Sequence, residues 1–129
     1  MMKEQEQVRE FMLKAEQECP DRPTTLPDRA DIRALRVALI QEELDEYNAA
    51  QFREDLTEIA DAIADLLYVV LGTAVAHGMD IDPIFQEVHS SNMSKFIDGH
   101  KDKSGKWIKG PSFRSPDLKP LLDKQITKQ

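Results

Sequence analysis

Apolar residues recur every three or four positions along most of the first 96 residues, which is the spacing of amphipathic helices. The pattern predicts helices over about residues 3–18, 28–50, 53–77 and 82–96. Three prolines in the segment CPDRPTTLPD indicate an ordered linker between the first two helices. Gly78 follows the third helix, at a position where glycine commonly ends a helix. We therefore expect an all-α fold, a bundle of four main helices.

The helical spacing stops after Phe96. The following segment, GHKDKSGKWIKGPSF, and the later Pro116 and Pro120 predict a loop and an extended basic tail. A short hairpin around Ser104 and Gly105 is the one strand pair that the pattern allows. We expect a single domain over residues 1–129, with a helical core at about 3–96 and an irregular tail at 97–129.

The charges of the chain are unevenly distributed. The net charge is −7, yet residues 42–65 hold nine acidic residues against one basic residue, Arg53. Residues 95–129 hold nine basic and four acidic residues. This distribution disfavours a nucleic-acid-binding protein, in which a basic surface should dominate the domain. It favours a protein that gathers divalent cations in one place and phosphates beside them.

Three features indicate a soluble, cytoplasmic protein without a membrane partner. Cys19 is the single cysteine, which excludes an internal disulfide framework and fits a reducing compartment. The first residues, MMKEQEQ, contain no apolar signal region. The longest apolar run, residues 66–76, is shorter than the roughly 20 residues that a membrane span needs.

Helical geometry places several carboxylates on inward-facing sides. At about 100° per residue, Glu46 lies about 60° and Leu39 about 40° from Glu43, so both glutamates fall within the apolar arc of their helix. The next helix carries an acidic stripe within about 60°, opposite its apolar side. The members of this stripe are Glu54, Glu58, Asp61 and Asp65.

Carboxylates in such positions need compensation, because an isolated ionised carboxylate in apolar surroundings is strongly destabilising. Acidic residues three or four apart on facing helices can converge on a divalent cation, and an all-oxygen ligand set suits Mg²⁺ or Mn²⁺. Buried ion pairs are an alternative for the two glutamates, and a solvated face is one for the acidic stripe. A di-iron site is disfavoured, because no histidine follows a glutamate by three residues.

Two stretches, LIQEELDEYNAA and DLTEIADAIADLLYVVLGTA, resemble the MazG-like all-α nucleoside triphosphate pyrophosphohydrolases. The motif of these enzymes is E-E-x-x-E, a spacer and E-x-x-D. The segments EVHSSNMSKF and GKWIKGPSFRSPDL resemble the subgroup described as phosphoribosyl-ATP pyrophosphohydrolase-like. The resemblance implies a MazG-type domain that hydrolyses (deoxy)nucleoside triphosphates between the α- and β-phosphorus, giving monophosphate and pyrophosphate, for sanitation of the nucleotide pool.

The resemblance also implies roles for individual residues. The expected Mg²⁺ ligands are Glu43, Glu46, Glu58 and Asp61, with Asp65 as a further or supporting ligand. Glu42 would orient or deprotonate the attacking water. We expect Asn92, Lys95 and Lys109 to bind the substrate phosphates, where basic groups can stabilise the leaving pyrophosphate.

Alternatives remain open at this point. Within the same enzyme class, the substrate could be phosphoribosyl-ATP of histidine biosynthesis, and outside it the chain could be a non-enzymatic acidic helical interaction module. The resemblance implies a homodimer or homotetramer with sites near the interface. Phe11 and Trp107 are candidates for stacking on a base, but Phe11 continues the apolar stripe of the first helix, which favours a core position. Tyr68 lies near the acidic stripe, where a hydrogen bond to a ligand carboxylate and core packing are both open.

Overall fold

The computed structural model describes residues 1–128 and confirms the all-α class. Its helices are α1 (Lys3–Lys14), α2 (Ala30–Arg53), α3 (Leu56–Ala76), α4 (Ile81–Met93), α5 (Lys95–Asp98) and α6 (Lys119–Thr127). Two short strands, β1 (His100–Lys101) and β2 (Trp107–Ile108), pair in an antiparallel manner. The chain divides into two compact units, Met1–Asp80 and a second unit that begins at Ile81. The assignment of residues 1–129 to one domain stays a prediction.

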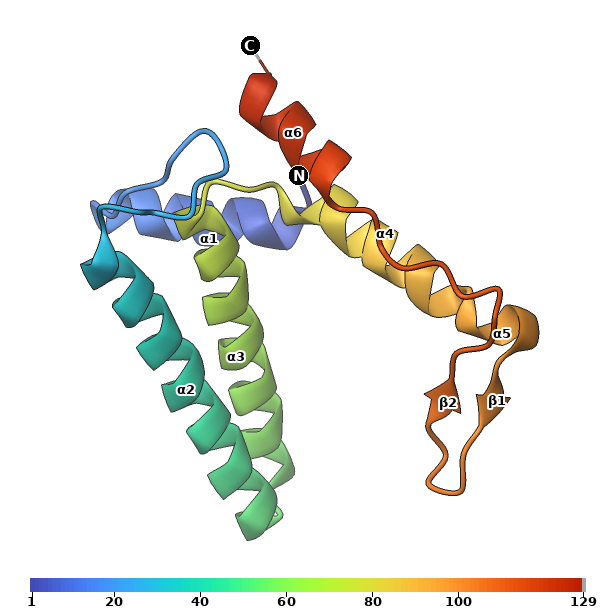
Figure 1. Ribbon diagram of the computed structural model, residues 1–129. Coiled ribbons are helices and arrows are strands. Elements are labelled where there is room, and N and C mark those ends of the chain that lie inside the picture. The colour runs from blue at the N-terminus through green and yellow to red at the C-terminus, as the bar shows by residue number, and fades with distance from the viewer. Residues whose placement is uncertain (129) are drawn as a thin grey trace. The chain divides into compact units, whose positions relative to one another are not determined.

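In the first unit, α2 and α3 form an antiparallel helical hairpin (Figure 1). The connection between them consists of Glu54, which adopts a left-handed conformation at φ 52°, and Asp55. The carboxylate of Asp55 accepts a hydrogen bond from the Glu58 backbone N–H and so caps α3 at its N-terminus. Because the turn is this short, the end of α2 and the start of α3 lie side by side.

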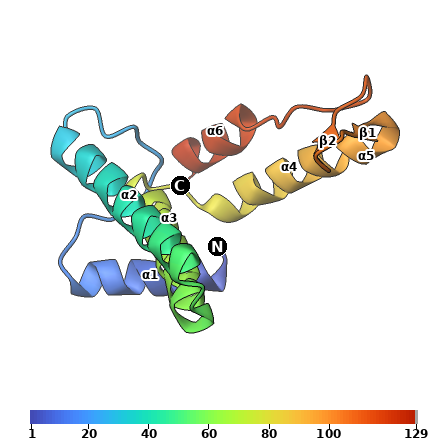
Figure 2. The same cartoon turned by 90° about the horizontal axis from the view of Figure 1, so that it is seen from below.

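The core of the first unit lies where α1 crosses the hairpin, near the start of α2 and the end of α3 (Figure 2). Val8 and Met12 of α1 are buried there, together with Leu71 and Val75 of α3. At the hairpin turn the large apolar side chains Phe52 and Leu56 are exposed, Phe52 to 93%. The same holds along α3, where Ile63, Leu67 and Val70 are about half exposed.

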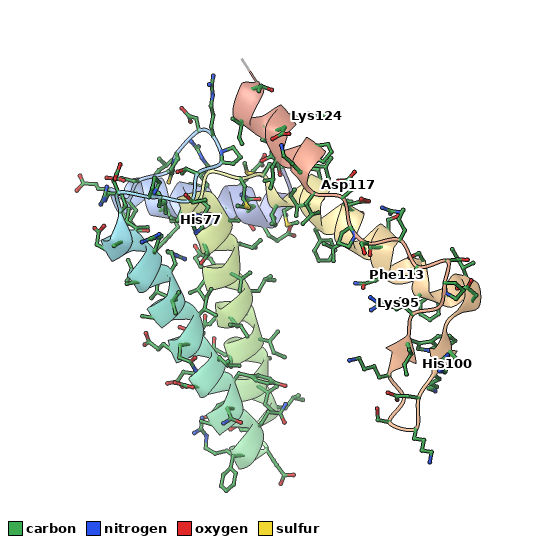
Figure 3. All side chains as sticks on the ribbon, viewed as in Figure 1. His77, Lys95, His100, Phe113, Asp117 and Lys124 are labelled. Carbon is green, nitrogen blue, oxygen red and sulfur yellow. The ribbon has the colours of Figure 1, made fainter. Side chains whose placement is uncertain are left out.

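The end of α3 joins the linker between α1 and α2. Gly78 has φ +67°, and its N–H and that of Met79 donate to the carbonyls of Val75 and Ala74, which is the hydrogen-bond pattern of a Schellman motif. The predicted glycine at the helix end is therefore confirmed. His77, labelled in Figure 3, shares two hydrogen bonds with the backbone of Thr24, one through its ring at 2.8 Å.

Within the described residues, α3 is long and apolar enough to cross a membrane, judged by length and composition alone. Core helices of globular proteins satisfy the same criterion. The sequence-based expectation counted only the uninterrupted apolar run and so missed this property of the whole helix. In the structure α3 packs against both α1 and α2 and carries three carboxylates on one side.

The second unit is built on α4. After α5 and the β1–β2 hairpin, the chain returns along α4 and is held by charged hydrogen bonds. Arg114 donates to Glu87 Oε2 at 2.9 Å and to Ser90 Oγ at 2.8 Å, and the Asp117 backbone N–H donates to the same glutamate oxygen at 3.0 Å. Asp98 accepts two hydrogen bonds from the backbone N–H of Ser112, both at 3.1 Å, and one from its hydroxyl.

The structure corrects the prediction for residues 97–129. The short hairpin is confirmed, with Gly105 at φ +90°. The extended tail is wrong in part, because α6 forms over Lys119–Thr127. Pro120 lies in its first turn, where a missing N–H costs no hydrogen bond, so this proline starts a helix and does not exclude one. The first helix also ends four residues earlier than expected, at Lys14.

Candidate functional site

A pocket of about 330 Å³ lies between α2 and α3 near the hairpin turn. The five carboxylates of the motif and Asp65 of the acidic stripe all line it: Glu42, Glu43 and Glu46 from α2, and Glu58, Asp61 and Asp65 from α3. Ala50, Arg53 and Ala62 complete the lining. Glu54 does not belong to the lining, because it occupies the turn between the helices and not the stripe of α3.

The pocket is open. Glu43 is partly buried, whereas Glu42 and Glu46 and the three acidic residues of α3 are exposed. The prediction that Glu46 points into an apolar interior is therefore wrong for a single chain. The pocket is formed by two helices alone. No described element of the first unit packs over its open side. The apolar arc of α2 is accordingly also open, with Leu35 50% exposed.

The carboxylates affect one another electrostatically. Partial burial raises the pKa of Glu43, and the negative charges of Asp65, Glu42, Glu46 and Asp61 raise it further. Among these charges, that of Asp65 raises the pKa of Glu43 most. Asp65 therefore belongs to the same acidic cluster as Glu43. A divalent cation would reverse this repulsion, because it favours the ionised form of every carboxylate near it.

Arg53 is the one basic residue that lines this pocket within positions 1–128, and the motif did not single it out. Its Nε and Nη2 atoms both lie 2.5 Å from Glu58 Oε2, so it neutralises one of the six acidic residues. The signal in the sequence was available, since Arg53 is the single basic residue between positions 42 and 65. Because it is the last residue of α2, the short turn brings it beside the first turn of α3.

The donor set fits a magnesium or manganese ion in chemical type, because it supplies carboxylate oxygens from two facing helices. As the side chains stand, no group of three histidine, cysteine, aspartate or glutamate residues within positions 1–128 is close enough to hold an ion. Most of these side chains are exposed and therefore free to change rotamer. Which of them are ligands stays a prediction.

The predicted substrate-binding residues belong to the second unit. Asn92 is exposed within α4 and does not end that helix. Lys95, labelled in Figure 3, begins α5 and is partly buried. The Lys109 ammonium lies 4.9 Å from the centre of the Phe113 ring. All three stay predictions as phosphate contacts.

A comparison with protein families gives a match to the phosphoribosyl-ATP pyrophosphohydrolase family over residues 8–92. The chain belongs to this family. The match includes all six carboxylates of the pocket and Asn92, and it ends before Lys95 and Lys109. It confirms the resemblance to the MazG-like enzymes and supports a nucleotide pyrophosphohydrolase activity in general terms.

One similar protein is the uncharacterized protein L479 of Acanthamoeba polyphaga mimivirus. It is 33% identical over 81 residues, which make up 53% of this chain and 32% of that protein. The chain thus spans about a third of the length of this relative.

Proposed function

We propose that the chain hydrolyses (deoxy)nucleoside triphosphates between the α- and β-phosphorus, giving a nucleoside monophosphate and pyrophosphate. The observation that carries the proposal is the convergence of six carboxylates on one pocket in a member of a pyrophosphohydrolase family. The biological role would be the removal of unwanted nucleotides from the cytoplasmic pool.

Glu43, Glu46, Glu58 and Asp61 would hold Mg²⁺ or Mn²⁺, with Asp65 as a further or supporting ligand. When bound, the metal supplies Lewis-acid activation of the phosphorus and of a water molecule. The acidic residues would make the pocket bind a triphosphate only together with a cation. Six carboxylates repel a metal-free triphosphate, and the single positive charge of Arg53 cannot offset this repulsion.

Glu42 lies on the same pocket and is exposed, so its carboxylate can reach a water molecule there. We assign it the orientation and deprotonation of the attacking water. Arg53 is positioned to exchange its bond with Glu58 for a phosphate oxygen once a cation draws Glu58 away. Asn92, Lys95 and Lys109 would stabilise the charge of the leaving pyrophosphate.

Phosphoribosyl-ATP is the second candidate substrate, and the description of the matching family favours it. Both candidates contain a triphosphate that is cleaved at the same bond, so the acidic pocket serves either. A non-enzymatic acidic interaction module fits less well, because it gives no reason for six carboxylates to converge within one family of hydrolases.

We also propose that the functional form is a homodimer or a homotetramer. Ile63, Leu67 and Val70 form an exposed apolar row on α3, and a bundle of more than two long helices would cover it. The open pocket would then lie near an interface between copies of the chain.

The deciding experiment incubates the pure protein and Mg²⁺ with canonical triphosphates and with phosphoribosyl-ATP. Pyrophosphate and orthophosphate are assayed separately. Pyrophosphate as the first product is expected, and the ratio of kcat/KM values identifies the substrate. Orthophosphate as the first product would refute cleavage between the α- and β-phosphorus.

Glu43→Gln tests the ligand assignment. It should abolish turnover and lower Mg²⁺ affinity while the fold is kept, because the variant removes an anionic ligand and relieves repulsion. Asp45→Asn is the matched control, since it removes one negative charge from the same helix outside the pocket. Full activity in Glu43→Gln would show that the ligand set is wrong.

A further inference from the structure

Arg36 of α2 is a buried cation without an acidic partner. The residue is 7% exposed; its Nε donates to Thr73 Oγ1 at 3.1 Å and its Nη2 to the Val69 carbonyl at 2.9 Å. Among the described residues no carboxylate forms an ion pair with it, and burial alone lowers its pKa. These two bonds use two of the five guanidinium N–H groups, so this buried group retains donor capacity.

Arg36 lines a second pocket, of about 200 Å³, between α1, α2 and α3, and also lines a separate pocket that contains Glu16 and Glu18. Among the described residues, Arg36 is the only charged one that lines the second pocket. The remaining lining is apolar, aromatic or neutral and includes Phe11, Gln17, Leu39, Tyr68 and Gly72. The Phe11 and Tyr68 rings meet edge to face with centres 5.8 Å apart.

Phe11 and Tyr68 are not core residues, which corrects the expectation for Phe11. They are 55% and 41% exposed, so one flank of the pocket consists of accessible aromatic surface. Gly72 makes room on the other side. A Cβ at this position would lie 2.5 Å from Arg36 Nη2, so the absence of a side chain is what allows the guanidinium to sit there.

The residues of this pocket follow those of the acidic pocket along the same two helices. Arg36 and Glu43 are seven residues apart on α2, which puts them on one face at a separation of about 10.5 Å along the axis. On α3, Asp65, Tyr68 and Gly72 follow one another at intervals of three and four residues, so they also share a face. A molecule with its phosphates at the acidic residues can therefore reach Arg36 with its other end.

We propose that the pocket of Arg36, Phe11 and Tyr68 binds the base of the nucleotide substrate and selects bases with an oxo group. The inference rests on the proposed function. An aromatic flank suits a flat ring, and a guanidinium presents donors only, so it needs acceptors on the edge of that ring. Guanine, hypoxanthine, uracil and thymine carry a carbonyl where adenine and cytosine carry an amino group.

The direction of selectivity follows from hydrogen-bond chemistry. The carbonyl oxygen of an oxo base accepts a hydrogen bond from Arg36. An amino group in the same place would put its N–H donors against the N–H donors of the guanidinium, and no hydrogen bond would form. Sites that hydrogen-bond one substrate group reject the analogue that lacks it. A charged hydrogen bond of ordinary strength corresponds to a preference in kcat/KM of roughly 10- to 100-fold.

The kinetic test compares dGTP, dITP and dUTP with dATP and dCTP by their rates of pyrophosphate release. Arg36→Met should reduce the preference to less than about threefold by slowing the oxo substrates. Arg33→Met, a change to an exposed residue one turn away, should leave the preference intact. Gly72→Ala serves as a second variant if Arg36→Met fails to fold, because it displaces the guanidinium without removing it.

A binding test needs neither metal nor turnover. Inosine and uridine carry no phosphate, and in the absence of Mg²⁺ they should shift the backbone amide resonances of Leu39 and Gly72, whereas adenosine and cytidine should not. Inosine binding without hydrolysis of any triphosphate would refute the proposed function and leave the base site standing.

Two outcomes would overturn the base site. One is hydrolysis of all triphosphates at similar kcat/KM values that Arg36→Met does not change. The other is the absence of any resonance shift with inosine; a change of oligomeric state in Arg36→Met would then show that a second copy of the chain covers this pocket.

Discussion

Gly72→Ala tests the contact between α3 and Arg36 on which the second pocket depends. In an exposed helix, exchanging glycine for alanine stabilises by about 1 kcal/mol. Here the new methyl group would lie 2.5 Å from Arg36 Nη2, so the guanidinium must move and its 2.9 Å bond to the Val69 carbonyl is lost. A hydrogen bond from a charged donor contributes about 1.5–3 kcal/mol, so we expect a net loss of about 0.5–2 kcal/mol.

The assay is urea unfolding followed by far-ultraviolet circular dichroism. Ala64→Gly, at an exposed position of the same helix, measures helix propensity alone and should cost about 1 kcal/mol. In an Arg36→Met background the sign should reverse, and Gly72→Ala should stabilise by about 1 kcal/mol, because the clash with the guanidinium is removed and Val8 Cγ1, at 3.4 Å, is in ordinary van der Waals contact with the new methyl group. Equal stabilisation by Gly72→Ala in the wild-type and the Arg36→Met backgrounds would show that the Arg36 guanidinium does not lie against Gly72.

Two further predictions concern charged residues. Arg53→Met should raise the affinity for Mg²⁺ by roughly two- to fivefold in calorimetry without nucleotide, because it frees Glu58 from an exposed ion pair; an unchanged affinity would show that Glu58 is not a ligand. The hydrogen bonds from Arg114 and from the Asp117 backbone hold the pKa of Glu87 below its ordinary value. Stability should therefore fall as pH drops from about 4.3 through the lower folded pKa, and Glu87→Gln should flatten this dependence in urea titrations.

Periodicity predicted the parts of the fold that depend on local sequence. The four main helices, the glycine after α3 and the convergence of six carboxylates all follow from residues spaced by three and four on neighbouring helices. The pattern does not predict α6, because Pro116 and Pro120 both favour an extended chain. Proline is common both in loops and in the first turn of a helix. The apolar residues Leu121 and Leu122 that follow Pro120 distinguish the two cases and indicate a helix.

Exposure could not be predicted, because it depends on what covers each face. Glu46 and Phe11 both continue apolar arcs, yet both are exposed in a unit whose hairpin has two helices and whose α1 crosses only one end. The place of Arg36 was equally hidden. The helical spacing puts Arg36 on the same side of α2 as Glu43, but its burial without an acidic partner among the described residues depends on Gly72, which lies 36 positions later in the chain.

The groove between α2 and α3 separates two kinds of recognition along its length. Near the turn, the short connection and the acidic stripe of each helix place charge where a cation and phosphates can meet. Near α1, the same two helices carry glycine, leucine, tyrosine and one buried arginine, where charge is scarce and a single guanidinium acts in a less polar setting. On the proposed function, the acidic end would serve any nucleotide, and selection among nucleotides would fall to the end that has one charged group. On this reasoning, substitutions near the turn change turnover for all substrates together, and substitutions near α1 change the order of preference among them.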